Sequence, residues 1–406
     1  MVMFSDGTDE PCRGYVPLHV GDTLYHGEFE IVRKLGWSIN SSVWLAKLSD
    51  SVLQRARADN PEYVAIKVLT AHATADEADE LSYELELTAK MREMKHDSHP
   101  GVEHCLTLQR DYFWEHSVHG LHLCLVFDPC GSTLEGLRYQ QSPPRFPLAV
   151  VKRFMKQVLL ALDFLHTRCS AVHCDVKLAN VLVKIDRDPA VISRYLREHP
   201  SESYSTRNSP DLYDAPIITT KSQPLPNFGL DASLSNLDVY LADFGSAIPL
   251  EDLTWYSEPL TPVLFKAPEQ ILGCAWSTPA DIWAVGCMVF SALTGREVFR
   301  LYRKSDSDDT TDVHLARIVE HIGPFPAAFL KRCRKRTQYF DRTGGYLKAA
   351  KPDGGPLENR LSKALSDTLD SGDMQQTAAF IRRCLTIDPD DRATAAQLLE
   401  DPWLAP

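Results

Sequence analysis

The chain has 406 residues, of which 44% are hydrophobic and 24% are charged, a balance typical of folded globular proteins. This length is enough for about two lobes. The formal net charge of −12 argues against direct nucleic-acid contact and favours a basic partner. No apolar run reaches the roughly 18 residues that a membrane helix needs, so we expect no membrane partner.

The first eleven residues have neither the basic flank nor the apolar core of a secretory signal. The ten cysteines lack the spacing of a small disulfide-bonded domain. We therefore expect reduced thiols and a location in the cytoplasm or the nucleus.

The predicted elements change character along the chain. β-branched and aromatic runs predict strands, at residues 29–36, 42–47, 63–69 and 121–127. Residues 76–94 contain few helix breakers and predict one helix. After a Pro/Gly break at residues 128–131, helical patterns follow, at residues 149–166, 279–293, 374–385 and 393–399. This order predicts an α+β fold with an N-terminal extension (1–20), a small sheet lobe (21–128) and a larger helical lobe (129–406).

The stretch between Asn180 and Asp243 is much longer than a hairpin between two strands requires. Residues 189–200 have a short helix pattern, whereas residues 201–236 are crowded with Ser, Pro, Asn and Asp. We interpret residues 189–236 as a surface insertion in the second lobe.

The strongest chemical signal lies at residues 173–180 and in an Asp-Phe-Gly tripeptide at residues 243–245. Asp175, Lys177 and Asn180 are spaced so that they can face one phosphoryl-transfer site. In such sites the Asp accepts the hydroxyl proton of the substrate, and the Lys contacts the transferred phosphate. Mg2+ needs only one or two protein oxygens, which Asn180 and Asp243 would supply.

Both carboxylates also have a simpler structural interpretation. Asp175 could cap a loop, and Asp243 could be a turn residue before a glycine. An Ala-Pro-Glu tripeptide at residues 267–269 and a predicted helix start at Asp281 argue against coincidence, because all these features would have to occur together.

Residues 36–43 stand where a glycine-rich phosphate loop would be expected, although only Gly36 of a G-x-G-x-x-G pattern is present. Alone, Gly36 is explained as a turn glycine, and Ser38 gives the backbone less freedom than a second glycine would. Lys67, in an Ala-Ile-Lys strand, either extends to solvent or, as we favour, contacts nucleotide phosphates. Its expected carboxylate partner is Glu84, with Glu86 as the alternative.

Other ligand-binding patterns are missing from the sequence. The His/Cys groups lack the paired spacing of zinc sites, and His122 and Cys124 are expected to be packing residues. No G-x-x-x-x-G-K-[ST] loop occurs, which excludes the P-loop class of ATP users.

From about Gly21 to Trp403 these residues resemble the eukaryotic protein kinase superfamily, and within it most closely the SR-protein kinase family. The segments that carry the likeness are residues 14–17, 20–22, 33–37, 41–45, 99–101, 122–127, 241–247 and 392–403. The resemblance implies a bilobal kinase fold. It also implies transfer of the ATP γ-phosphate to Ser hydroxyls of proteins, with Thr hydroxyls as the alternative. The expected substrates are arginine/serine-rich proteins linked to mRNA splicing, and the expected state is a monomer.

The resemblance also implies roles for single residues. Asp175 would be the catalytic base and Lys177 would assist transfer. Glu269 and Arg392 would form a buried ion pair, and Asp281 would brace the catalytic loop. With ATP and Mg2+ as cofactors, the residues expected at the nucleotide or metal are Leu35, Gly36, Trp37, Ser38, Val43, Ala65, Lys67, Glu84, Phe127 as gatekeeper, Asp128, Cys130, Asn180, Leu182 and Asp243.

The chain departs from the kinase pattern at three positions. Ser38 and Asn40 replace a glycine and a usually aromatic loop tip, which is compatible with a weakly active or inactive pseudokinase scaffold. Cys174 replaces an arginine that binds activation-loop phosphate, so we predict activity without loop phosphorylation. A small-molecule phosphotransferase of the aminoglycoside or choline type is a further alternative, but such proteins lack the Asp-Phe-Gly and Ala-Pro-Glu segments.

Overall fold

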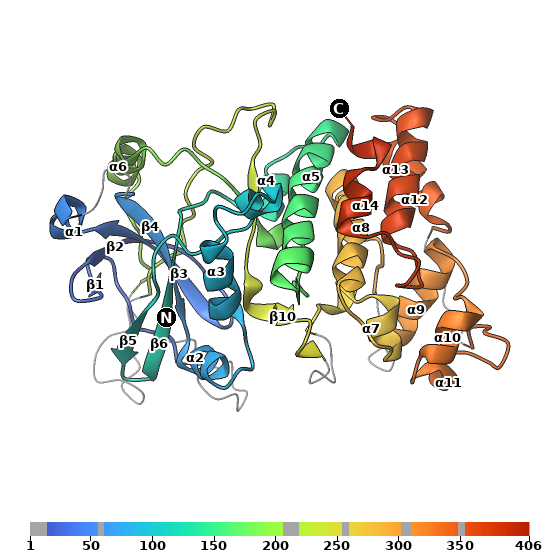
Figure 1. Cartoon of the computed structure of the whole chain (residues 1–406). Helices are drawn as coiled ribbons and strands as arrows, with labels where there is room; N and C mark the ends of the chain where they lie inside the picture. Colours follow the sequence, from blue (N-terminus) through green and yellow to red (C-terminus); the bar gives the residue numbers. More distant parts are fainter. Residues whose placement is uncertain are drawn as a thin grey trace. The chain divides into compact units, whose positions relative to one another are not determined.

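The computed structural model describes residues 14–55, 61–205, 219–253, 260–301, 310–347 and 354–405. The chain forms two compact units, shown with their elements in Figure 1. Unit 1 comprises Met1–Met94, Leu106–Ser132 and Val183–Asp231, and unit 2 comprises Lys95–Cys105, Thr133–Leu182 and Ala232–Pro406. Among the described residues, no helix has both the length and the apolar character needed to cross a membrane.

Unit 1 is built on a six-stranded antiparallel sheet with the order β1-β2-β3-β4-β6-β5. Its strands are β1 (Thr23–Leu24), β2 (Phe29–Trp37), β3 (Ser41–Leu48), β4 (Tyr63–Leu69), β5 (Phe113–Ser117) and β6 (Gly120–Phe127). The side chains alternate between two apolar clusters, as the period of two in a strand dictates. Ile66 and Val126 belong to one cluster, and Ala65 and Leu125 belong to the other. The four strands predicted from the sequence are confirmed within one or two residues.

The helical segment after β4 differs from the prediction. Instead of one helix over residues 76–94, the chain forms α2 (Ala71–Ala78) and α3 (Glu84–Glu93). Glu80 between them adopts a left-handed backbone conformation (φ 58°), which ends α2. The Glu77 carboxylate then accepts the amide N–H groups of Glu84 (2.9 Å) and Leu85 (3.2 Å) at the start of α3. These contacts satisfy two of the unpaired amides of a helix start.

Residues 189–231 of the insertion cluster with unit 1, and only residues 232–236 fall in unit 2, whereas the sequence placed the whole insertion in the second lobe. Helix α6 (Pro189–Glu198) begins after Asp188, whose side chain accepts the amide N–H of Ala190 at 2.8 Å. Ile192 of α6 and Leu225 form an apolar cluster with Leu45 and Tyr63 of the sheet. The insertion therefore supplies core residues to the sheet unit, which explains its position there.

Unit 2 is mainly helical. Its longer helices surround α8 (Pro279–Thr294), which is buried along almost its whole length and packs against α5, α12 and α13. Gly286 allows this approach, because a Cβ there would lie 2.8 Å from the Cβ of Cys384. The other helices are α4 (Leu134–Tyr139), α5 (Leu148–Phe164), α7 (Pro268–Leu272), α9 (Thr310–His321), α10 (Ala327–Arg332), α11 (Arg336–Tyr339), α12 (Leu357–Leu365), α13 (Ser371–Cys384) and α14 (Ala395–Leu399). Two short ladders join β7 (Ala171–Val172) to β10 (Ile248–Pro249) and β8 (Val181–Val183) to β9 (Val239–Leu241). Helix α1 (Asp50–Arg55) belongs to unit 1.

A disulfide joins Cys274, two residues after α7, to Cys333, the residue that follows α10. The expectation of reduced thiols is therefore wrong for this pair. The other cysteines of the described residues lie outside this disulfide: Cys105, Cys124, Cys130, Cys169, Cys174, Cys287 and Cys384. Distant cysteines that tertiary structure brings together leave no local spacing pattern.

Candidate active site

The residues expected at the nucleotide and at the reaction centre form two groups, one in each unit. Unit 1 holds Leu35, Gly36, Trp37, Ser38, Val43, Ala65, Lys67, Glu84, Phe127, Asp128 and Cys130. Unit 2 holds Asp175, Lys177, Asn180, Leu182 and Asp243.

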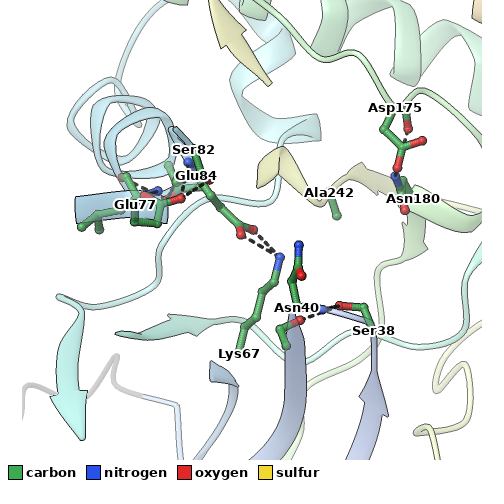
Figure 2. A network of polar contacts seen from close by, with 12 residues as sticks. Ser38, Asn40, Lys67, Glu77, Ser82, Glu84, Asp175, Asn180 and Ala242 are labelled. Atoms are coloured by element: carbon green, nitrogen blue, oxygen red, sulfur yellow. Dashed lines mark hydrogen bonds and ion pairs between the residues drawn. The ribbon is translucent and has the colours of Figure 1, made fainter. Parts of the chain in front are cut away.

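In unit 1, Lys67 of β4 forms an ion pair with Glu84, the first residue of α3 (Figure 2). The Lys67 Nζ lies 2.6 Å from Oε1 and 2.7 Å from Oε2 of Glu84. The two side chains are only 13% and 4% exposed. Glu86 is exposed on another side of the helix, so the structure selects Glu84 among the two alternatives. An ammonium held in this way is fixed at a defined position on the sheet.

The apolar residues expected around the nucleotide also come together in unit 1. Ala65 and Phe127 are paired neighbours on β4 and β6, and Leu35 and Val43 pack against the same cluster. Cys130, three residues after Phe127, is half-buried, and desolvation raises the pKa of its thiol to about 12. Its sulfur is therefore a neutral packing group at physiological pH.

The phosphate loop (residues 36–43) joins β2 to β3. The Ser38 amide N–H donates to the Ser41 carbonyl at 2.8 Å, and the two serine hydroxyl oxygens lie 2.9 Å apart. Trp37 and Ile39 at the tip are 46% and 53% exposed. A Cβ built on Gly36 would meet no atom within 4 Å, so contact with a neighbouring protein atom is not the reason that a glycine stands here. Open space beside a loop backbone is what a bound phosphate requires.

In unit 2, Asn180 contacts Asp175, as Figure 2 shows, and Lys177 contacts the same carboxylate. The Oδ2 atom of Asp175 accepts hydrogen bonds from Lys177 Nζ at 2.7 Å and from Asn180 Nδ2 at 2.8 Å. The same Asn180 nitrogen lies 2.9 Å from the Asp175 carbonyl oxygen. The other carboxylate oxygen, Oδ1, is buried and has no hydrogen-bond partner among the described residues. A buried acceptor in this state is ready to receive a ligand proton.

Asp281, near the start of α8, binds the backbone of the loop that carries Asp175. Asp281 Oδ2 accepts the His173 amide N–H at 2.8 Å, and Oδ1 accepts the Cys174 amide N–H at 2.9 Å. His166 Nε2 lies 2.9 Å from the same carboxylate. These contacts fix the backbone next to Asp175, so Asp281 braces the catalytic loop as expected.

The Asp-Phe-Gly segment is tied to the same loop through its backbone. The Ala242 amide N–H donates to the Asn180 carbonyl at 2.9 Å, and the His173 ring lies 5.1 Å from the Phe244 ring. Asp243 follows Ala242 directly and has a left-handed backbone (φ 64°). These contacts bring the two sequence motifs together around Asn180.

Glu269 and Arg392 form the expected ion pair, with both side chains 0% exposed. Two Arg392 nitrogens donate to the two Glu269 oxygens at 2.7 and 2.9 Å. Arg392 also donates to the carbonyls of Thr386, Pro279 and Ile387, so its remaining three N–H groups have partners. Full pairing is what makes a buried charge tolerable.

Sequence reasoning missed several residues that hold these groups in place. Glu77 positions the start of α3, and Tyr15 donates hydrogen bonds to the phosphate loop. A carboxylate that caps a helix seven residues later and a tyrosine outside the loop follow no spacing rule. Only the tertiary structure reveals them.

The protein kinase domain family matches residues 49–196 and 227–404, which together form most of the chain, and the protein is therefore a protein kinase. Residues 1–48 precede the match, and the gap within it, residues 197–226, lies in the insertion. Within the superfamily, the chain belongs to the SR-protein kinase family and is a serine/threonine protein kinase.

Three relatives illustrate this membership. Serine/threonine-protein kinase SRPK of Physarum polycephalum is 30% identical, over 98% of this chain and 91% of its own length. Protein kinase dsk1 of Schizosaccharomyces pombe is 28% identical, over 96% and 83% respectively. SRSF protein kinase 3 of Mus musculus is 24% identical, over 97% and 89%. Family membership confirms the predicted kinase fold and implies ATP and a protein as substrates.

Proposed function

We propose that this kinase transfers the ATP γ-phosphate to serine hydroxyls, with threonine as an alternative acceptor, in arginine/serine-rich proteins linked to mRNA splicing. The observation that carries the catalytic part is the Asp175 carboxylate. One oxygen is held by Lys177 and Asn180, while the other is buried without a partner among the described residues.

This geometry suits general-base catalysis at Asp175. Lys177 and Asn180 fix the carboxylate, so its second oxygen can take the proton of an incoming serine hydroxyl. Lys177, whose ammonium lies beside the carboxylate, is placed to stabilise negative charge on the transferred phosphoryl group. Positioning and electrostatic stabilisation are the main contributions a protein makes to this reaction.

The donor atoms of Asn180 and Asp243 fit Mg2+, which prefers hard oxygen ligands. Asn180 uses its Nδ2 on Asp175, which directs its amide oxygen away from that carboxylate. A bound Mg2+ would neutralise phosphate charge. In unit 1, the Lys67 ammonium, held by Glu84, would contact the α- and β-phosphates.

Replacement of the proposed base tests this function. Asp175→Ala should reduce kcat by about 10²- to 10⁴-fold, the usual contribution of general acid–base catalysis. Asp367→Asn, an exposed carboxylate in the same unit, is the matched control and should retain full turnover. Near-normal turnover of Asp175→Ala would refute the assignment. An inactive wild-type protein would instead favour the pseudokinase scaffold, for which Ser38 and Asn40 are the main argument.

The arginine/serine-rich substrate class is proposed from the family and from charge. A protein with a net charge of −12 attracts basic segments through long-range fields, and salt screens this attraction. The KM for an Arg/Ser peptide should therefore rise with ionic strength. Equal rates on an acidic serine peptide, or a KM that does not change with salt, would contradict the proposal.

We also infer activity without phosphorylation of the segment after the Asp-Phe-Gly tripeptide. Cys174, which stands where a phosphate-binding arginine would be, is buried, and desolvation raises the pKa of its thiol. A neutral thiol cannot pair with a phosphate as an arginine does.

Three hydroxyls in that segment are candidates for modification. The Thr261 hydroxyl is buried and accepts a hydrogen bond from Gln270 Nε2 at 2.9 Å. Thr254 and Ser257 lie outside the described residues. Phosphatase treatment, or substitution of the three residues, should leave turnover unchanged, and loss of turnover would disprove this inference.

Two further proposals come from the sequence alone. We propose that the kinase is a monomer, which sedimentation of the purified protein would test. We also propose a cytoplasmic or nuclear location, which imaging of the tagged full chain would test.

A further inference from the structure

The segment that precedes the sheet reaches the tip of the phosphate loop. The Tyr15 hydroxyl lies 2.6 Å from the Ser38 carbonyl oxygen and 2.9 Å from the Ile39 carbonyl oxygen. The tyrosine is only 4% exposed, so its ring is packed inside unit 1. Its single O–H group is thus shared between two consecutive carbonyls of the loop.

The backbone before Tyr15 is built to hold this position. Gly14 has a φ of 67°, and a Cβ there would lie 3.0 Å from the Cβ of His119 and 3.2 Å from that of Ala71. The Gly14 carbonyl accepts the Ala71 amide N–H at 2.8 Å. Only glycine fits both the left-handed conformation and the close approach. Tyr15 is therefore anchored at the start of α2.

The N-terminal end of α2 also binds the loop tip directly, through its cap residue Thr70. The Thr70 amide N–H donates to the Asn40 carbonyl at 2.9 Å, while the Thr70 hydroxyl accepts the Ala73 amide N–H at 3.2 Å as the helix cap. Three consecutive carbonyls of the tip, from Ser38 to Asn40, are thus bound by groups of the surrounding unit.

These contacts determine where the amides of the loop point. In a planar trans peptide, the C=O and the next N–H point in opposite directions. Because Tyr15 binds the carbonyls of Ser38 and Ile39, the N–H groups of Ile39 and Asn40 point away from Tyr15. The Asn40 amide N–H donates to the Ser38 hydroxyl oxygen at 3.4 Å, a long hydrogen bond within the loop. Backbone N–H groups oriented in this way are the donors that a phosphate loop offers to nucleotide phosphates.

We propose that Tyr15 is a positioning residue for ATP, acting through the loop backbone. By binding the Ser38 carbonyl, its hydroxyl directs the Ile39 amide N–H toward the terminal phosphates. The Trp37 and Ile39 side chains at the tip are largely exposed, so backbone contacts fix the tip instead. Ser38 has less conformational freedom than the missing glycine, and Tyr15 selects one orientation of this stiffer loop. This role rests on the proposed function, in which the loop contacts ATP.

The experiment removes the hydroxyl alone. Tyr15→Phe keeps the packed ring, and loss of one shared hydrogen bond should raise the KM and the Kd for ATP by about three- to tenfold. Because the contact acts on the phosphate side, affinity for ADP should fall less, and affinity for adenosine should not change. The KM for the peptide substrate should also stay the same.

Tyr63→Phe is the matched control in the same unit. Tyr63 is equally buried, and its hydroxyl lies 2.8 Å from the Ser193 hydroxyl oxygen of α6, away from the loop. This variant should bind ATP like the wild type. The role of Tyr15 would be overturned if Tyr15→Phe left the affinity for ATP unchanged. It would also be overturned if the variant lowered the affinity for adenosine by the same factor as the affinity for ATP. A wild-type protein that neither binds nor turns over ATP would overturn the proposed function itself.

Discussion

The disulfide between Cys274 and Cys333 gives the most direct test of how unit 2 is stabilised. Both cysteines are buried, and they are 59 residues apart in the sequence. The bond joins the end of α7 to the end of α10, with the central helix α8 inside the closed loop. Reduction by a small dithiol would convert the bond to two thiols and oxidise the dithiol to its own disulfide.

The size of the effect follows from the length of the closed loop. A cross-link over 59 residues removes conformational entropy from the unfolded chain, worth about 4 kcal/mol at 25 °C. In the folded state, the Lys335 amide N–H donates to the Leu272 carbonyl at 3.0 Å, and Arg334 Nε donates to the Gly273 carbonyl at 2.9 Å. These bonds beside the disulfide keep the two segments together after reduction. The effect should therefore appear mainly as easier unfolding.

Urea unfolding with and without dithiothreitol measures this difference. With a urea m-value of about 3 kcal/mol per M, the midpoint for unit 2 should fall by roughly 1.3 M on reduction. The double variant Cys274→Ala/Cys333→Ala should unfold at the lower midpoint and be insensitive to the reductant. A midpoint that reduction does not shift in the wild type would show that the cross-link contributes no stability.

Other predictions follow from buried groups. Glu269→Gln leaves the Arg392 charge uncompensated at a buried site and should lower the free energy of unfolding by about 3–5 kcal/mol, measured by urea unfolding. Ile192→Ala should destabilise unit 1 by about 2–5 kcal/mol, because it removes the contact of α6 with the sheet core, and a thermal melt would measure this. Burial lowers the pKa of His314 to about 3. The unfolded chain therefore binds a proton first, and stability falls by about 1.4 kcal/mol per pH unit from about pH 6.5 toward pH 3. His314→Phe should make this slope shallower in unfolding measurements across that range, and an unchanged slope would contradict the reasoning.

The predicted strands agree with the structure because their signals are local. A run such as Tyr63–Leu69 satisfies the same alternation and β-branched preference wherever it occurs. The helix after β4 was predicted wrongly because its break depends on Glu77 and Glu80, which both have ordinary helix propensity. Their effect comes from a side chain that caps a helix further along the chain.

The insertion was misplaced for a related reason. Its stretch rich in Ser, Pro, Asn and Asp resembles a surface loop, and the helix pattern of residues 189–200 does not indicate which unit the apolar face of that helix contacts. Ile192 and Leu225 find their partners on β3 and β4, far away in the sequence. Whether an apolar residue joins a core depends on the residues it contacts, and composition alone does not reveal these contacts.

The catalytic loop was predictable because its chemistry is encoded in short spacings. Asp175, Lys177 and Asn180 lie within six residues, and a tight loop brings them together. The support of the phosphate loop was not predictable, because Tyr15 lies 23 residues before Ser38 and its contact uses a backbone carbonyl. Any residue could offer that carbonyl, so no side-chain pattern marks it.

The departures from the kinase pattern share a physical feature. At Ser38 and at Cys174, the groups that hold the chain in place bind its backbone, through the Tyr15 hydroxyl in one case and the Asp281 carboxylate in the other. A contact to a carbonyl or an amide N–H does not depend on the side chain of the residue it holds. The side chains at these positions can therefore change while the backbone geometry stays fixed. On this reasoning, residues that bind the backbone, such as Tyr15 and Asp281, should tolerate substitution less well than Ser38 and Cys174 themselves.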